Sequence, residues 1–216
     1  MFIPAKFKQD NIDEIISVMC DYPFATLVAQ IGAGIEVVHL PVSVESTENG
    51  IVLKSHIAKA NPFWNMVEEH SKVLVIFNGA HSYISPSYYP TKAKHGRAVP
   101  TWNYVVVHAK GDIKYVHEPQ AVYQILETLT DEQEAQFDFP WSISDAPSDF
   151  IEKLQTAVVG IEVQVGSLEG KWKVSQNQPD ENIQGIIDGL KMSTNPMASE
   201  MVSLIRQCSK SMLTSK

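Results

Sequence analysis

The stretch that decides the fold class lies at residues 24–56 and reads FATLVAQIGAGIEVVHLPVSVESTENGIVLKSH. It contains three strand-like runs separated by turn signals, at residues 24–31, 35–44 and 51–56. The first turn signal is Gly32-Ala33-Gly34 and the second is Asn49-Gly50. Glycine and Asn-Gly pairs favour the left-handed torsions that tight hairpins need. The stretch therefore predicts successive antiparallel hairpins.

The rest of the chain continues the same pattern of short strands and turns. Further strand candidates lie at 73–77, 81–85, 100–109, 113–117, 158–168 and 171–176, the last two joined at Glu169-Gly170. Helices are predicted at 12–21, from Asn61-Pro62 to about His70, from Pro119, near 145–155 and from Asn195-Pro196. About nine strands joined by short hairpins favour an antiparallel barrel, mainly β with peripheral helices (α+β), over a βαβ fold.

The domain organisation is expected to be simple. Residues 1–190 are predicted to form one barrel domain. The C-terminal helix, within residues 191–216, is predicted to pack on this barrel or on a partner subunit. The polar stretch 178–195 is expected to be a flexible connection.

Composition narrows the class of protein. The chain has 216 residues, a formal net charge of -8 and a pI of about 5.3. An acidic surface disfavours DNA binding, because contacts to DNA phosphates need Lys and Arg gathered on one face. The compact basic run from Thr91 to Arg97 could contact DNA or a ligand phosphate through Lys92, Lys94 and Arg97, although a solvated loop is the commoner meaning of such a run. The two cysteines show no CxxC spacing, and the apolar runs are too short to cross a membrane. We expect a cytoplasmic protein.

The segment from Lys54 to Trp64 has the features of a phosphate site. A strand ends here, a short loop carries Lys59, and Asn61 and Pro62 suit the start of a helix, where unpaired N–H groups favour an anion. Lys54 and Ser55 would add charge and a hydroxyl donor. The alternative is an ordinary capped helix with solvated lysines.

Two other segments combine aromatic and polar residues. Asn103 carries a donor and an acceptor, and Trp102 beside it could stack on a planar ligand. The alternative is a barrel strand with one buried polar residue. Strand 170–177 has polar residues that could reach a ligand across a subunit boundary or could face water. We find no HExxH or similar metal-ligand spacing, no P-loop, no GxSxG elbow and no GxGxxG fingerprint.

Eight short motifs in order give the chain a resemblance to the PaiB family of FMN-binding negative transcriptional regulators. They are MFIP with Phe7 (1–7), PFATL (23–27), HLP (39–41), HIAKANP (56–62), SYISPSYY (82–89), VPTWNY with His108 (99–108), VGIE (159–162) and GKWKVSQN (170–177). The family more often has Trp at Tyr88, Arg at Lys59 and Tyr at Phe2. The resemblance extends from residue 1 to about 190.

This resemblance implies an FMN-binding split β-barrel that works as a homodimer with FMN between subunits. It implies that the segment from Lys54 to Asn61 holds the phosphate and ribityl chain and that Trp102 and Asn103 lie near the isoalloxazine. Residues 173–176 would approach from another part of the barrel or from the partner. The expected cofactor-binding residues are Lys54, Ser55, His56, Lys59, Asn61, Trp102, Asn103, Lys173, Ser175 and Gln176.

Three functions remain open at this point, and one of them is a flavin store or a split barrel whose site has decayed, although the intact site aromatics and lysines argue against decay. The family name implies a flavin-binding transcriptional regulator, acting either indirectly or through weak DNA contact. Another reading is an FMN-dependent oxidoreductase acting on a small molecule, because a bound flavin supplies redox chemistry by itself. No catalytic residue is identified, although His56, His81 and Tyr83 are candidate proton donors.

Overall fold

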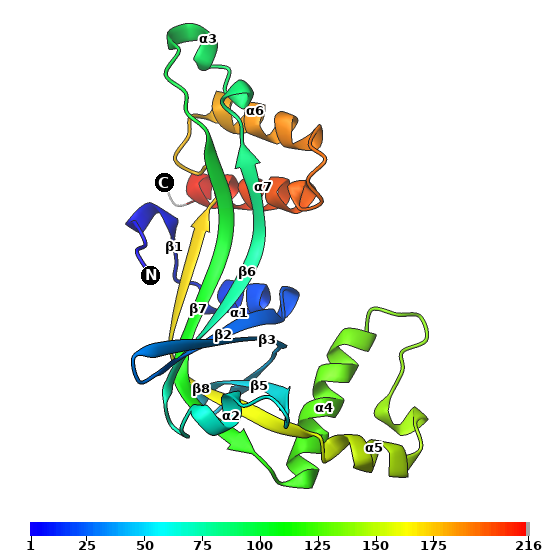
Figure 1. The fold of residues 1–216 in the computed structure, drawn as a ribbon. Coiled ribbons are helices and arrows are strands. Elements are labelled where there is room, and N and C mark those ends of the chain that lie inside the picture. Colours follow the sequence, from blue (N-terminus) through cyan, green and yellow to red (C-terminus); the bar gives the residue numbers. More distant parts are fainter. Residues whose placement is uncertain (215–216) are drawn as a thin grey trace. The chain divides into compact units, whose positions relative to one another are not determined.

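The computed structural model describes residues 1–214, with side chains to residue 209, and shows an eight-stranded antiparallel sheet (Figure 1). The strands are β1 (Lys8–Gln9), β2 (Phe24–Ile31), β3 (Gly34–Pro41), β4 (Ser43–Thr47), β5 (Gly50–Ala58), β6 (Lys72–Ile84), β7 (Thr101–Val116) and β8 (Val158–Lys173). The strand order is β3-β2-β6-β7-β8-β5-β4, and β1 pairs with β8. The described sheet is not closed, because the path ends at β3 and β4.

The chain divides into two compact units. Unit 1 comprises Met1–Ile12, Asn78–Val107 and the described residues from Glu169 onward, and unit 2 comprises Asp13–Phe77 and His108–Leu168. Strands β6, β7 and β8 each contribute residues to both units. The predicted division into residues 1–190 and 191–216 stays a prediction.

Unit 2 contains the two predicted hairpins. Strands β2 and β3 pair from Phe24↔Pro41 to Ile31↔Gly34, and Gly32 at the turn has φ +54°. The turn between β4 and β5 places Gly50 at φ +108°, a torsion that glycine adopts without a Cβ clash. Helix α1 (Ile12–Asp21) begins and ends where the sequence predicts. The two turns and helix α1 are confirmed. The predicted single strand at 35–44 is wrong, because β3 ends at Pro41 and residues 43–47 form β4 at the other end of the sheet path.

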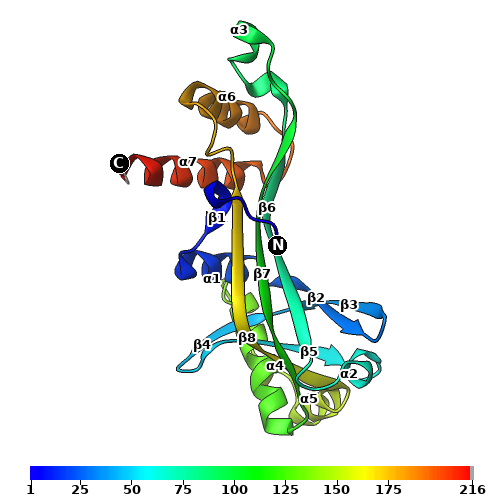
Figure 2. The same ribbon diagram turned by 90° about the vertical axis from the view of Figure 1, so that its left-hand side faces the viewer.

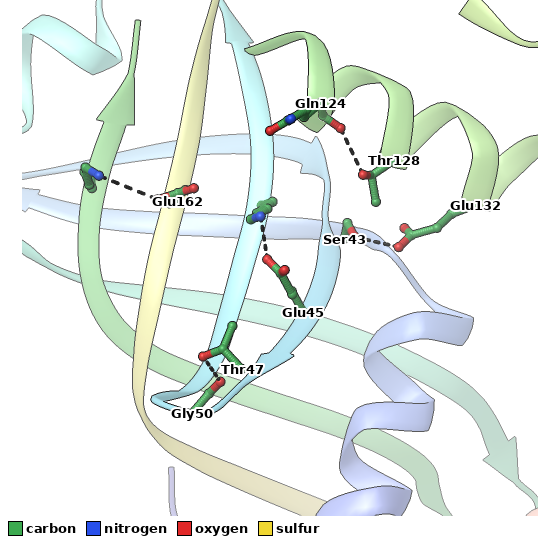
Figure 3. A network of polar contacts seen from close by, with 10 residues as sticks. Ser43, Glu45, Thr47, Gly50, Gln124, Thr128, Glu132 and Glu162 are labelled. Carbon is green, nitrogen blue, oxygen red and sulfur yellow. Dashed lines mark hydrogen bonds and ion pairs between the residues drawn. The ribbon is translucent and has the colours of Figure 1, made fainter. Parts of the chain in front are cut away.

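Helix α4 (Pro119–Glu134) covers β4 and β5 in unit 2. Its apolar side contributes Val122, Ile125 and Leu129 to a buried cluster with Val116 of β7. The Ser43 hydroxyl donates to the Glu132 carboxylate at 2.5 Å and ties β4 to this helix (Figure 3). The remaining elements of the unit are α2 (Phe63–Met66), η3 (Ile143–Asp145) and α5 (Ser148–Gln155).

Unit 1 carries two long helices, α6 (Asp180–Lys191) and α7 (Ala198–Thr214), which pack on one another (Figure 2). Their largest fully buried side chains are Ile186, Leu190, Met201 and Ile205. The unit also contains η1 (Ala5–Phe7), η2 (Pro86–Tyr88) and α3 (Lys92–His95). No helix among the described residues is long and apolar enough to span a membrane.

Three predicted strand breaks are wrong. The candidates at 73–77 and 81–85 are one strand, β6, and those at 100–109 and 113–117 are one strand, β7. Strand β8 likewise runs through Glu169-Gly170. Gly79 and Gly111 do not mark turns, and their lack of a side chain permits close approach of a neighbouring strand. A Cβ at Gly111 would lie 2.2 Å from the Gln164 carbonyl oxygen, and a Cβ at Gly79 would lie 3.2 Å from Val105.

Two predictions about helices also need correction. The helix after Pro62 ends at Met66, not near His70, since Val67 is already extended. The stretch 178–195 is not a flexible connection, because residues 180–191 form α6. Its buried side chains Ile183, Ile186, Ile187 and Leu190 follow a helical spacing. The last predicted helix is α7, and residues 215–216 lie outside the described chain.

Candidate functional site

The segment predicted to hold a phosphate lies in unit 2, where β5 ends. The Asn61 side-chain oxygen accepts from the backbone N–H of Phe63 at 3.0 Å, as expected of a cap. The backbone around Lys59 is held on both sides, because its N–H donates to the Ala157 carbonyl at 2.8 Å and its carbonyl accepts from the Trp64 indole at 2.9 Å. The Lys59 side chain is exposed. Because α2 has only four residues, the charge of Lys59 and not a helix dipole would attract an anion here.

The predicted cofactor-binding residues of β5 lie on two opposite faces of the strand. Ser55 is 2% exposed, and its hydroxyl donates to the Pro41 carbonyl at 2.5 Å. Lys54 and His56 point to the opposite face of the strand, because successive strand residues face opposite ways. Lys54 forms an ion pair with Glu45 (Figure 3). The structure therefore does not bring Ser55 together with Lys54 and His56.

His56 lines a pocket of about 480 Å³ that also includes His39 and Asn61. The Nδ1 atom of His56 is buried and has no hydrogen-bond partner among the described residues. Burial lowers the pKa of this imidazole below its ordinary value of 6.5. An unpartnered buried nitrogen carries a desolvation cost that a ligand group could remove. We call this site the His56 pocket.

The lowered pKa of His56 predicts how stability depends on pH. The unfolded chain takes up a proton near pH 6.5, whereas the folded protein takes it up only at lower pH. The contribution of His56 to stability is therefore fully present above pH 6.5 and is lost as the pH falls below that value. The free energy of unfolding, measured by urea denaturation, should decrease between pH 7 and pH 5. We expect this decrease to be smaller in His56→Gln than in the parent. Parallel pH profiles for the parent and the variant would contradict this assignment.

The second group of predicted residues lies in unit 1, around a pocket of about 270 Å³. Asn103 is 1% exposed, and the Ser175 hydroxyl lies 2.9 Å from its Nδ2 atom and 3.0 Å from its Oδ1 atom. The Lys173 ammonium donates to the Trp102 carbonyl at 2.7 Å and to the Thr101 hydroxyl. The structure thus brings three predicted residues together, Asn103, Lys173 and Ser175. We call this site the Lys173 pocket.

The backbone at Ser175 is strained. Its φ is +64°, in the left-handed region that residues with a side chain seldom occupy. Such outliers occur disproportionately at functional sites, where the surrounding contacts enforce them. Here the bond to Asn103 holds the strained residue at the wall of the pocket.

The other two predicted residues of unit 1 do not line this pocket. The Gln176 side chain is used internally: its oxygen accepts from Val174 N–H at 2.9 Å, and its nitrogen donates to the Lys6 and Trp172 carbonyls. Trp102 is 53% exposed and contacts other rings, with centroids 6.1 Å from His81 and 6.0 Å from Tyr83. These three rings form an exposed aromatic cluster.

Several lining residues of the Lys173 pocket were not among the ten expected cofactor-binding residues. They are Phe7, Tyr89, Ala98, Val99, Pro100, Thr101, Asn177, Gln178 and Asn182, while Arg97 was expected to contact DNA or a phosphate. The polar run continues from Lys173 to Gln178, and this continuity was the available signal. Asn182 could not be found in this way, because it lies on the unforeseen helix α6.

The residues present fit the cofactor that the family resemblance implies. FMN combines an anionic phosphate and ribityl hydroxyls with a ring whose polar edge needs donors and acceptors. Unit 2 offers the exposed Lys59 and the unpartnered His56 nitrogen. Unit 1 offers Lys173, Arg97 and the Asn103 amide. No cluster of side chains suited to a metal ion occurs among the described residues.

Comparison with known proteins identifies the family. Residues 1–167 match the family described as "Putative FMN-binding domain". The chain is 29% identical over 205 residues to the protease synthase and sporulation protein PAI 2 of Bacillus subtilis, covering 95% of this chain and 96% of that protein. It is 28% identical to protein AN0679 of Emericella nidulans, covering 96% and 97% of the two chains.

A solved structure shows the fold. The FAD and heme binding protein of Mycobacterium smegmatis superposes with a TM-score of 0.58 at 13% identity, covering 84% of this chain and 80% of that one. This likeness confirms the predicted split-barrel fold, although the described sheet is open. The match over most of the chain, together with the similarity to PAI 2, confirms the PaiB resemblance and FMN as the cofactor. The chain belongs to the FMN-binding domain family.

Proposed function

We propose that this flavin-binding protein is a PaiB-type negative regulator of gene expression that works as a homodimer. The observation that carries the proposal is the extent of the similarity to PAI 2. The FMN-binding family match ends at residue 167, whereas the similarity to PAI 2 covers 95% of this chain. The region carrying Lys173, Ser175 and α6 is therefore largely shared with a protein named for protease synthesis and sporulation.

An indirect regulatory action fits the charges better than direct DNA contact. Lys94 is paired with Glu181 at 2.5 Å, and Arg97 lines the Lys173 pocket. Lys92 alone of the three expected DNA contacts has no such role among the described residues, and the net charge of the chain is -8. If a promoter fragment does bind through this run, a mobility-shift assay will show steep weakening with salt.

The regulatory proposal is tested by measuring transcripts in a strain lacking the gene. Complementation with the parent protein is expected to lower the transcripts that rise in the deletion strain. A variant unable to bind FMN, present at equal abundance, is expected not to lower them. Unchanged transcripts in the deletion strain would contradict a regulatory role while leaving FMN binding intact.

Lys59→Ala tests whether the predicted segment binds the FMN phosphate. Loss of a charge-assisted contact costs about 1.5–3 kcal/mol, so we expect FMN binding to weaken about tenfold or more. Riboflavin lacks the phosphate, and its affinity is expected to stay unchanged. Lys153→Ala on α5 removes the same charge from another exposed position of unit 2 and serves as the control. Fluorescence titration of both ligands measures the four affinities, and equal FMN affinity in the two variants would exclude Lys59.

The homodimer is supported by exposed apolar side chains in unit 1. Val99 is 74% exposed, Trp102 53% and Tyr83 47%. Aromatic side chains are enriched in protein interfaces. Light scattering is expected to give twice the chain mass of 24.1 kDa for the parent. Trp102→Ser is expected to shift the population toward the monomer, and a monomeric parent would contradict the proposal.

A second candidate function is an FMN-dependent oxidoreductase acting on a small molecule. The exposed aromatic cluster of His81, Tyr83 and Trp102 favours it, because flat rings can hold a planar substrate. The FMN-loaded protein would then lose its yellow colour with NADH and regain it with a suitable acceptor. A spectrum unchanged by NADH and by other reduced donors would contradict the oxidoreductase function and leave the regulatory function as the remaining proposal.

A further inference from the structure

The charge of the Lys173 pocket is not balanced by its own walls. Its lining includes two cationic side chains, Arg97 and Lys173, and no carboxylate. Neither side chain forms an ion pair with an acidic group among the described residues. The acidic residue Glu181 on α6 is already paired with Lys94 at 2.5 Å. The pocket therefore has a net positive lining.

The Lys173 ammonium is held in place by neutral groups. Its partners are the Thr101 hydroxyl and the Trp102 carbonyl, and its side chain is partly buried. Burial lowers the pKa of this ammonium, the neighbouring Lys171 lowers it further, and Tyr104 acts in the opposite direction. A partly desolvated cation without a counter-charge is unfavourable, and attraction to a bound anion would offset part of that cost.

The remaining walls supply neutral hydrogen-bonding groups. Asn103, Ser175, Asn177 and Asn182 all line the same space. Asn182 is fixed there because its Oδ1 accepts from the Thr91 hydroxyl at 3.0 Å and from the Thr91 N–H at 3.3 Å. A pocket of about 270 Å³ is slightly below the range of about 300–1,000 Å³ that holds whole drug-sized ligands. Its size suits a small group better than an entire flavin.

We propose that the Lys173 pocket binds a phosphate group through Arg97 and Lys173. Two cations match the charge of a phosphate dianion, and the guanidinium can donate two parallel hydrogen bonds to it. If the phosphate belongs to FMN, the inference rests on the FMN-binding function, and Lys59→Ala is then expected to show no phosphate-specific effect. If Lys59 holds the FMN phosphate, the group bound here belongs to a separate small molecule. Both sources present the same chemistry to the pocket.

The test measures thermal unfolding of the full-length protein against inorganic phosphate at constant ionic strength. When phosphate exceeds its Kd tenfold, we expect the melting temperature of the parent to rise by about 3 °C or more. Arg97→Gln and Lys173→Gln are expected to need about tenfold more phosphate for the same shift. Arg97 is exposed, so its replacement should leave the fold intact. Lys92→Gln, which removes an exposed charge outside the pocket, is the matched control and should respond like the parent.

Repeating the measurement with bound FMN distinguishes the two sources. If FMN abolishes the phosphate response, and Arg97→Gln weakens binding of FMN but not of riboflavin, the group is the phosphate of FMN. If the FMN-loaded protein still responds, a separate phosphate compound occupies the pocket. No phosphate-specific shift in the parent, or equal shifts in all variants, overturns the proposal. In that case intact FMN binding and a transcript effect would leave the proposed function standing.

Discussion

Gly111→Ala is expected to lower the free energy of unfolding by about 3 kcal/mol or more. The added Cβ would lie 2.2 Å from the carbonyl oxygen of Gln164 and 2.9 Å from a Val163 methyl group. The contacted oxygen is backbone in the neighbouring strand β8, which also pairs with β5. Relief of the clash therefore requires that paired strands separate locally.

Urea denaturation measures this effect, and Gly166→Ala is the matched control. Gly166 lies in β8, two residues after Gln164, whose carbonyl oxygen would clash with a side chain at position 111. A Cβ added at Gly166 would contact only the Lys110 carbonyl oxygen, at 3.8 Å. Alanine is favoured over glycine within a strand, so the control is expected to be neutral or stabilising by up to about 1 kcal/mol. Equal destabilisation by the two substitutions would show that the close approach at Gly111 has no energetic role.

Gly185→Ala is expected to destabilise unit 1 by about 2 kcal/mol, although alanine is the better helix former. The new Cβ would lie 2.2 Å from the Tyr88 carbonyl oxygen and 2.7 Å from the Pro90 ring. Helix α6 would have to move away from this segment. The same movement would strain the bond between Thr91 and Asn182 at the Lys173 pocket. We therefore expect weaker phosphate binding together with the loss of stability.

A second glycine of α6 provides an internal comparison. A Cβ at Gly189 would lie within 2.5 Å of Tyr88 ring atoms, which Tyr88→Ala removes. The double substitution Gly189→Ala with Tyr88→Ala should therefore destabilise less than the sum of the single changes. Tyr88→Ala should not rescue Gly185→Ala, because the backbone oxygen remains. Urea unfolding of the single and double variants checks both statements, and rescue in both pairs would contradict the contact assignment.

Only part of the candidate site could be predicted from the sequence. The family resemblance led us to expect Asn103, Lys173 and Ser175 as cofactor-binding residues, and the structure places the three around one pocket. Strand alternation alone places Ser55 and His56 on opposite faces of β5, but which of the two faces is covered depends on packing. Arg97 belongs to a basic run, and no local pattern shows which part of the folded chain this run will contact. In the structure Arg97 lines the same pocket as Lys173.

The sequence by itself determined the elements whose cause is local. The turn glycines Gly32 and Gly50 adopt left-handed torsions that glycine tolerates, and α1 follows from its apolar stripe and polar start. The tertiary structure decided that Gly111 continues a strand and that Gly185 lies inside a helix. A glycine at a turn and a glycine under a neighbouring chain look alike in sequence. They differ only in which distant backbone comes within 3 Å, and that contact exists only after the chain has folded.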